Sequence, residues 1–152
     1  MQAPEEEEKV AKFVWEDGST YEGGWSAVPD PAAEPVEAAE GEEAPAAAEK
    51  KVRHGTGTFA TGDYTYDGDW VEDKMEGVGT FTFAGGATYE GEWVADRYHG
   101  LGKYTGADGS SYEGQWSEGK MHGQGTFVNA KGQKFAGQFF NGNGLGLTLV
   151  LD

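Results

Sequence analysis

Three histidines and one glutamate hold equivalent places in this sequence of 152 residues, each directly before a glycine pair spaced Gly-x-Gly. They are His54, Glu76, His99 and His122. Imidazole and carboxylate groups are zinc ligands, so the row raises the question of a metal site. If the segments between them form paired strands, neighbouring members lie two strands apart, about 10 Å. Zinc needs all ligands within about 2.1 Å, so we predict no metal centre and assign the row to turns and backbone contacts.

The glycine pairs themselves raise a second possibility, because glycine-rich loops can hold phosphate groups. The pairs are Gly55/Gly57, Gly77/Gly79, Gly100/Gly102 and Gly123/Gly125. Dinucleotide and P-loop sites need a strand, a loop and a helix in succession, and the P-loop ends in Gly-Lys-Ser/Thr. None of the pairs has this context, and no Ser/His/Asp set stands out. The sequence therefore predicts a protein without cofactor that is not an enzyme.

The elements around these pairs repeat. Five segments share an aromatic residue, a central glycine and a second aromatic residue: Tyr21–Trp25, Tyr66–Trp70, Tyr89–Trp93, Tyr112–Trp116 and Phe135–Phe139. The last four start 23 residues apart, and the first starts 45 residues before the second. Aromatic residues also follow each glycine pair, at Phe59, Phe81, Tyr104 and Phe127. Both halves of the unit alternate with a period of two, which is typical of half-buried strands.

Two kinds of connection join these strands. One carries Asp73, Asp96 or Gly119, residue types that tolerate the left-handed conformation of tight turns. The other carries Asp17-Gly18, Gly85-Gly86, Asp108-Gly109 or Lys131-Gly132, and such pairs favour primed two-residue hairpin turns. Each period therefore predicts one β-hairpin. Successive hairpins predict an all-β fold, a single-layer antiparallel meander.

Glycines inside the predicted strands need an explanation, because glycine there is destabilising by roughly 0.5–1 kcal/mol relative to alanine. Gly68, Gly91 and Gly114 share a face with the neighbouring Tyr and Trp. We predict that each leaves a socket for a ring from an adjacent strand. One face then becomes a continuous aromatic trough, while Glu, Asp, Gln and Thr cover the other.

These pentads, with Gly119–Phe127 (GKMHGQGTF), resemble the MORN repeat, the membrane occupation and recognition nexus motif. The resemblance covers most of residues 13–152 and implies an elongated, curved, single-layer sheet with an aromatic-lined trough. The C-terminal part is most similar to small MORN proteins of cilia and sperm. The last copy departs from the pattern, since Phe135 and Phe139 replace Tyr and Trp.

The domain organisation follows from composition. Residues 1–12 are predicted to be a disordered acidic tail, and residues 13–152 a domain of about five repeats. Residues 28–50 interrupt the first repeat with Ala, Glu and Pro, and such a segment lacks the apolar residues needed for a core. We predict a disordered loop there, and either a neutral insertion or a dedicated binding segment fits the composition.

The net charge of the sequence limits the classes of partner that it can bind. The net charge is −16, and residues 54–152 alone hold 13 acidic and 6 basic residues, a net of −7. A nucleic-acid backbone and an anionic bilayer both repel such a surface, so neutral or basic protein partners are expected. The sequence has no cysteine, no apolar run long enough for a transmembrane helix and an acidic start unlike a signal peptide. A cytoplasmic location is therefore expected.

The aromatic face has two interpretations that are not exclusive. Its rings form the core, or they also form a groove that binds a peptide or helix, because a single layer leaves the face uncovered and apolar strips mark interaction sites. The candidate partner-binding residues in the trough are Tyr66, Trp70, Phe81, Tyr89, Trp93, Tyr104, Tyr112, Trp116 and Phe127.

The C-terminal strand provides a second candidate contact. Counting alternation from the fourth repeat predicts that Leu147, Leu149 and Leu151 face the side that is polar elsewhere. This strand also forms a sheet edge, with neither Pro nor Lys to protect it. Strand addition by a partner, self-association and simple capping of the sheet all remain open.

The resemblance sets the functional expectation. It implies a structural or adaptor subunit of a cilium or flagellum, an axonemal component associated with radial spokes. The alternative is an adaptor that links a partner protein to membranes, as the family name implies.

Overall fold

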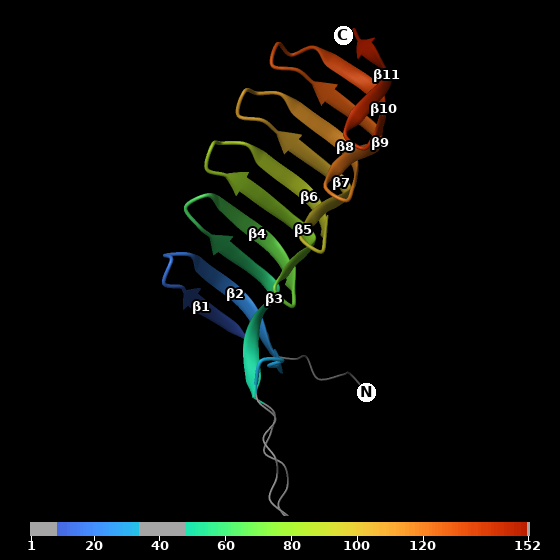
Figure 1. Ribbon diagram of the computed structural model, residues 1–152. Coiled ribbons are helices and arrows are strands. Elements are labelled where there is room, and N and C mark those ends of the chain that lie inside the picture. Colours follow the sequence, from blue (N-terminus) through green and yellow to red (C-terminus); the bar gives the residue numbers. More distant parts are fainter. Residues whose placement is uncertain (1–8, 34–47, 152) are drawn as a thin grey trace, which may run out of the picture.

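The computed structural model describes residues 9–33 and 48–151, which form one sheet of eleven strands (Figure 1). The strands are β1 (Val10–Val14), β2 (Thr20–Pro29), β3 (Glu49–Ala60), β4 (Tyr64–Val71), β5 (Lys74–Phe83), β6 (Thr88–Val94), β7 (Arg97–Thr105), β8 (Ser111–Ser117), β9 (Lys120–Val128), β10 (Lys134–Phe140) and β11 (Asn143–Val150). Every strand pairs antiparallel with the next one along the chain, so the sheet order is the sequence order. The hairpins follow one another in an elongated, curved row (Figure 1). The predicted single-layer all-β meander is confirmed.

The register aligns equivalent residues of neighbouring strands in columns. Tyr66 of β4 lies opposite Phe81 of β5, and Phe81 in turn lies opposite Tyr89 of β6. Glycines form a second column, in which Gly68 lies opposite Gly79. Since residues directly opposite each other point to the same face, the columns build one aromatic face along the whole sheet.

The sheet is held together by tyrosine rings that lie over glycines, but the prediction that Gly68, Gly91 and Gly114 form the sockets was wrong. The ring of Tyr66 covers Gly79, where an added Cβ would lie 2.5 Å from the tyrosine Cζ. Its hydroxyl donates a hydrogen bond to the carbonyl oxygen of Asp69 at 3.0 Å. The main sockets are thus the second glycines of the Gly-x-Gly pairs. Gly68 serves another purpose, because it allows the backbones of β4 and β5 to approach closely.

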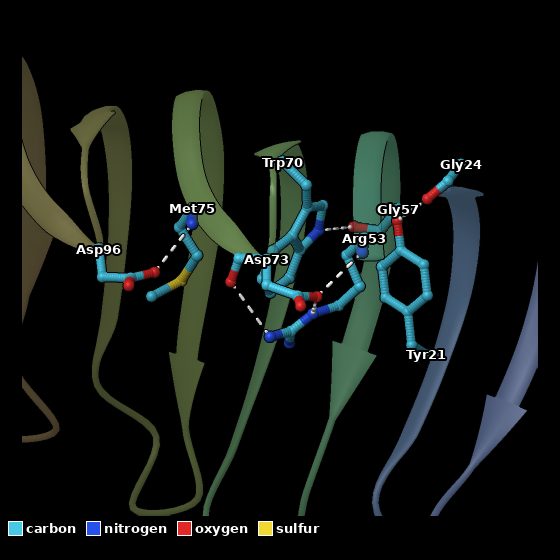
Figure 2. Close-up of polar contacts among 8 residues, drawn as sticks. All are labelled: Tyr21, Gly24, Arg53, Gly57, Trp70, Asp73, Met75 and Asp96. Atoms are coloured by element: carbon cyan, nitrogen blue, oxygen red, sulfur yellow. Dashed lines mark hydrogen bonds and ion pairs between the residues drawn. The ribbon is translucent and has the colours of Figure 1, made fainter. Parts of the chain in front are cut away.

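Three tryptophans, Trp70, Trp93 and Trp116, each link a hairpin to the preceding one. The indole N–H of Trp93 in β6 donates to the carbonyl oxygen of Gly79 in β5 at 3.1 Å. The same indole makes edge-to-face contacts with Tyr66 and Tyr89, at centroid distances of 5.1 and 5.2 Å. Trp70 and Trp116 make the same type of bond to Gly57 and Gly102 (for Trp70, Figure 2). The aromatic core is therefore continuous from one repeat to the next.

The fourth residue of the second, third and fourth pentads has a structural use on the other face. A bulge in β5 leaves the N–H of Val78 without a strand partner in register, and the carboxylate of Asp69 accepts it at 3.0 Å. Glu92 and Gln115 accept the N–H groups of Leu101 and Gln124 in the same way. These polar side chains are thus backbone acceptors rather than a freely solvated row.

The left-handed conformation predicted for Asp73, Asp96 and Gly119 is confirmed, but the primed turns predicted at the Asp-Gly and Gly-Gly connections were wrong. At the connections that carry Asp73 and Asp96, both residues of the two-residue turn have positive φ. Examples are Glu72 (46°) with Asp73 (69°) and Ala95 (47°) with Asp96 (67°). At the Asp-Gly and Gly-Gly connections only the final glycine has positive φ, as at Gly109 (83°). These loops are longer than two residues, and a left-handed glycine ends them before the next strand. The primed two-residue turns therefore use Asp or Gly at their second position.

The sheet is also longer than predicted at the first repeat. It begins at Val10, which lies opposite Gly24, so the first strand includes part of the expected tail. The expected loop is shorter at both ends, because Val28 and Pro29 continue β2 and pair with Lys50 and Glu49 of β3. Strand pairing satisfies their backbone groups and extends a two-stranded ribbon from the sheet (Figure 1). Residues 34–47 and 1–8 lie outside the described residues.

Candidate partner-binding trough

The pentad residues predicted to contact a partner form the floor of the trough. Tyr66, Tyr89 and Tyr112 are 0–2% exposed, and Trp70, Trp93 and Trp116 are 3–8% exposed. The other three predicted residues, Phe81, Tyr104 and Phe127, are half-buried and pack against this floor. The floor rings act mainly as core, and the half-buried rings lie above them.

A further row of side chains was not predicted as part of the trough. Met75, Tyr98 and Met121 lie opposite the three tryptophans and are half-buried. The ring of Tyr98 stacks on that of Tyr89, with centroids 3.7 Å apart and planes 13° apart. Their position in the sequence could have identified them, because each is the second residue after a hairpin turn and therefore lies on the aromatic face.

The trough is hollowed between these rows. One concavity of about 380 Å³ extends over β7–β9, where Tyr98, Tyr104, Trp116, Met121 and Phe127 line it. Another of about 300 Å³ lies over β5–β7, with Met75, Phe81, Phe83, Trp93 and Tyr98 among its lining residues. Tyr98 lines both, so the two concavities are neighbours along the trough. Each has the size of a small-ligand pocket and a largely apolar lining.

Hairpin turns form one wall of the trough by reaching back to the preceding hairpin. The carboxylate of Asp96 accepts the N–H of Met75 at 2.8 Å, and the N–H of Asp96 donates to the carbonyl oxygen of Met75 at 3.1 Å (Figure 2). Gly119 and Gly142 donate to Tyr98 and Met121 through their N–H groups alone. The wall is thus fixed by backbone bonds in every full repeat.

Arg53 takes the place of Met75 in the first repeat. Its guanidinium lies 4.1 Å from the ring centroid of Trp70 and pairs with Asp73, with 3.0 Å between Nε and Oδ1 (Figure 2). Because the carboxylate of Asp73 also accepts the N–H of Arg53 at 2.9 Å, the turn is held twice. The N-terminal part of the trough therefore contains a cation, although this one is neutralised.

The orientation predicted for the C-terminal leucines was wrong. Leu149 lies opposite Phe135, on the aromatic face, and Leu147 packs against the core. In the full repeats a bulge adds two residues to the second strand of the hairpin, as in β5 opposite β4. In the last hairpin the register shift between Ala136 and Gln138 of β10 adds only one residue to β11. This odd difference inverts the alternation. Leu151 follows β11 and is 84% exposed, and β11 is still the outermost strand.

Burial of the tyrosines predicts a loss of stability at alkaline pH. Burial raises the pKa of Tyr98 to about 12 and also raises the pKa of Tyr66, Tyr89 and Tyr112. An unfolded tyrosine loses its proton near pH 10, so above that pH the unfolded state holds fewer protons and the free energy of unfolding falls as pH rises. The contribution is complete below about pH 10 and is lost as the pH approaches about 12.

Denaturant unfolding at a series of pH values, with tyrosinate absorbance recorded in parallel, checks this expectation. We expect the buried tyrosines to ionise together with unfolding. Ionisation of all seven tyrosines near pH 10, with the midpoint of unfolding unchanged, would contradict it.

Within residues 9–33 and 48–151, no group of three or more His, Asp or Glu side chains is placed to hold a metal ion. The same part of the chain contains no helix with the length and apolar character to cross a membrane.

An open antiparallel sheet of successive 23-residue hairpins with one aromatic face defines a β-hairpin repeat protein. The family model described as the MORN repeat matches residues 66–88, 89–111 and 112–134, and each match begins at the first tyrosine of a pentad. The chain therefore carries three consecutive MORN repeats, in residues 66–134. A search of curated proteins found no matching relative. MORN repeats are in general structural, non-enzymatic units of proteins that mediate interactions with proteins or membranes.

Proposed function

We propose that this protein is a non-enzymatic adaptor or structural subunit that binds an apolar segment of a partner protein in the aromatic trough. The observation that supports this most directly is the pair of neighbouring apolar concavities over β5–β9. A second layer would normally cover such a face, and none of the described residues does so. Half-buried Tyr, Phe and Met side chains are also the types that anchor partners at interfaces.

The trough is rigid as well as apolar. Its floor rings are hydrogen-bonded and buried, and its wall is tied to the preceding hairpin. A preformed groove loses little conformational entropy on binding, so more of the contact energy appears as affinity. This favours recognition of a helix or an extended peptide over contact with a flat surface.

Substitution of Met121 tests the proposal. Met121→Lys is expected to weaken binding at least tenfold, because it places an ammonium group in the larger concavity while its aliphatic stem can still pack on the floor. The probes are peptides selected from a random 20-residue display library against the folded protein. Their affinities are measured by fluorescence anisotropy, and circular dichroism checks that the variant is folded.

Leu101→Lys is the matched control, since Leu101 is 62% exposed and lies on the other face of the sheet. It adds the same charge and is expected to leave binding unchanged. If peptides bind the Met121→Lys variant as tightly as the unmodified protein, the trough is not the binding site.

The outermost strand β11 provides a second contact in this proposal. Its free edge can accept another strand, and Leu149 is 43% exposed at that edge. The sequence from Phe140 to Leu151 has no charged residue, in contrast with the acidic character of the chain. This favours a protein partner or a second copy at this edge over a charged ligand.

The proposed location is the axoneme of a cilium or flagellum, in association with radial spokes. The resemblance of the C-terminal part to ciliary MORN proteins supports this location. Localisation of the tagged protein in ciliated cells, followed by detergent extraction, tests it: an axonemal subunit stays with the microtubules. Recovery with the membrane fraction would favour the alternative, an adaptor between a partner protein and membranes.

A further inference from the structure

The trough is not uniform in charge along its length. At the end formed by β1–β3, the ring of Trp25 lies near two ammonium groups, with its centroid 5.3 Å from Lys9 Nζ and 4.5 Å from Lys51 Nζ. Trp25 itself is half-buried, and both lysines are exposed. Cations over an indole face are held in place by its negative charge density, so the ring positions both lysines.

Register places all three residues on the aromatic face. Trp25 continues the alternation of Tyr21, and its N–H donates to the carbonyl oxygen of Lys9 at 2.9 Å, so these two residues lie side by side. Lys51 lies opposite Ala27, two residues beyond Trp25 and hence on the same face. The lysine pair is therefore an extension of the trough.

These two lysines differ from Arg53 and Lys12, which form ion pairs at the same end of the sheet. Arg53 pairs with Asp73, and Lys12, on the opposite face, pairs with Glu22 at 3.5 Å. Neither Lys9 nor Lys51 has a carboxylate within ion-pair distance in the described segments 9–33 and 48–151. In a chain of net charge −16, two cations fixed at one end of an apolar groove form a distinct feature.

We propose that the partner segment bound in the trough carries an acidic cluster at its end over β1–β3, where Lys9 and Lys51 bind its carboxylates. This inference rests on the trough function proposed above and adds the chemistry and direction of the ligand. The acidic body of the protein repels carboxylates over most of the sheet, so an acidic group is favoured where two lysines lie together on the trough face. Charge thus fixes the orientation of the segment, while the apolar concavities supply the anchors.

Strand spacing gives the length of the segment. Trp25 is in β2 and the larger concavity is centred on β8, six strand spacings away in the sheet order. At about 4.8 Å per strand, this separation is about 29 Å. A helix covers it with about 19 residues and an extended chain with about 9. The acidic cluster and the apolar anchor of the partner should be separated accordingly.

The selected 20-residue peptides test this proposal through their composition and through a double variant. We expect Asp and Glu to be enriched at one end and apolar residues at the other. Lys9→Glu with Lys51→Glu is expected to weaken binding of these peptides at least tenfold and to leave folding intact, because both side chains are exposed. Lys74→Glu with Lys131→Glu is the matched control, with the same change of charge at two exposed lysines, one on the other face of the sheet and one in the turn between β9 and β10.

The outcomes separate this proposal from the trough function. Peptides that bind through Met121 but lack acidic enrichment, or that bind both double variants equally, would overturn the acidic-end proposal and leave the trough function standing. Peptides insensitive to Met121→Lys would overturn both. Binding of the unmodified protein, but not of the Lys9/Lys51 double variant, to vesicles of phosphatidylcholine with phosphatidylserine would indicate a lipid occupant. A molecular mass in solution that is lower for this double variant than for the unmodified protein would indicate a second copy. Either result would also overturn the proposal.

Discussion

Replacing Gly91 with valine is expected to unfold the protein or to lower its free energy of unfolding by at least about 4 kcal/mol. A Cβ added at Gly91 would lie 2.4 Å from the Cα of Gly102 and 2.6 Å from the carbonyl oxygen of Leu101. Both are backbone atoms of the paired strand β7, so no rotamer change relieves the contact. The hydroxyl of Tyr89 would lie 2.9 Å away, so the ring would also be displaced. The strands would have to separate where the core is most tightly packed.

The measurement is urea unfolding followed by tryptophan fluorescence. The matched control is Glu90→Val, because Glu90 is the neighbouring exposed residue and points to the other face. Its substitution is expected to change stability by less than about 0.5 kcal/mol. Glu92 is a poor control, since its carboxylate accepts the N–H of Leu101 at 2.9 Å. Similar unfolding midpoints for the Gly91 and Glu90 variants would contradict the close approach of the two backbones.

The sequence was sufficient to predict the repeat, the hairpins and the aromatic face, because each of these depends on local alternation. A residue such as Tyr89 repeats every 23 positions with glycine and tryptophan in fixed places, and a period of two determines its face without knowledge of the register. The ring-over-glycine packing also followed, since few other arrangements explain glycines in the centre of strands.

Features that depend on register could not be predicted in this way. A bulge that adds one residue in β11 and two in the full repeats reverses the side on which Leu149 lies, and no composition signal reports its size. The contribution of Lys9 and Lys51 to the trough also depends on strand pairing beyond the expected ends of β1 and β3. The burial of the floor tyrosines and tryptophans could not be predicted either, because it depends on the second row of side chains at Met75, Tyr98 and Met121.

Replacing Trp93 with alanine is expected to lower the free energy of unfolding by about 3–5 kcal/mol. The indole is 3% exposed, contacts the rings of Tyr66, Tyr89 and Tyr98, and donates to the carbonyl oxygen of Gly79. Its removal leaves a cavity between two hairpins and takes away one of their few side-chain bonds. In a repeat protein the stability of the array depends on such nearest-neighbour contacts, so the two sides of the sheet should uncouple.

Amide hydrogen exchange measures this uncoupling directly. In the Trp93→Ala variant, we expect protection to fall most in β5 and β6 and to differ between the segments on either side. Trp93→Phe is the matched control, because Phe139 fills the equivalent place in the last repeat and is 4% exposed, with its ring 4.8 Å from that of Tyr112. The phenylalanine variant should lose less stability and unfold as one unit. Equal losses of stability in both variants would show that the indole N–H bond, and not the volume of the ring, couples the hairpins. Uniform loss of protection in the alanine variant would show that the sheet unfolds as a whole.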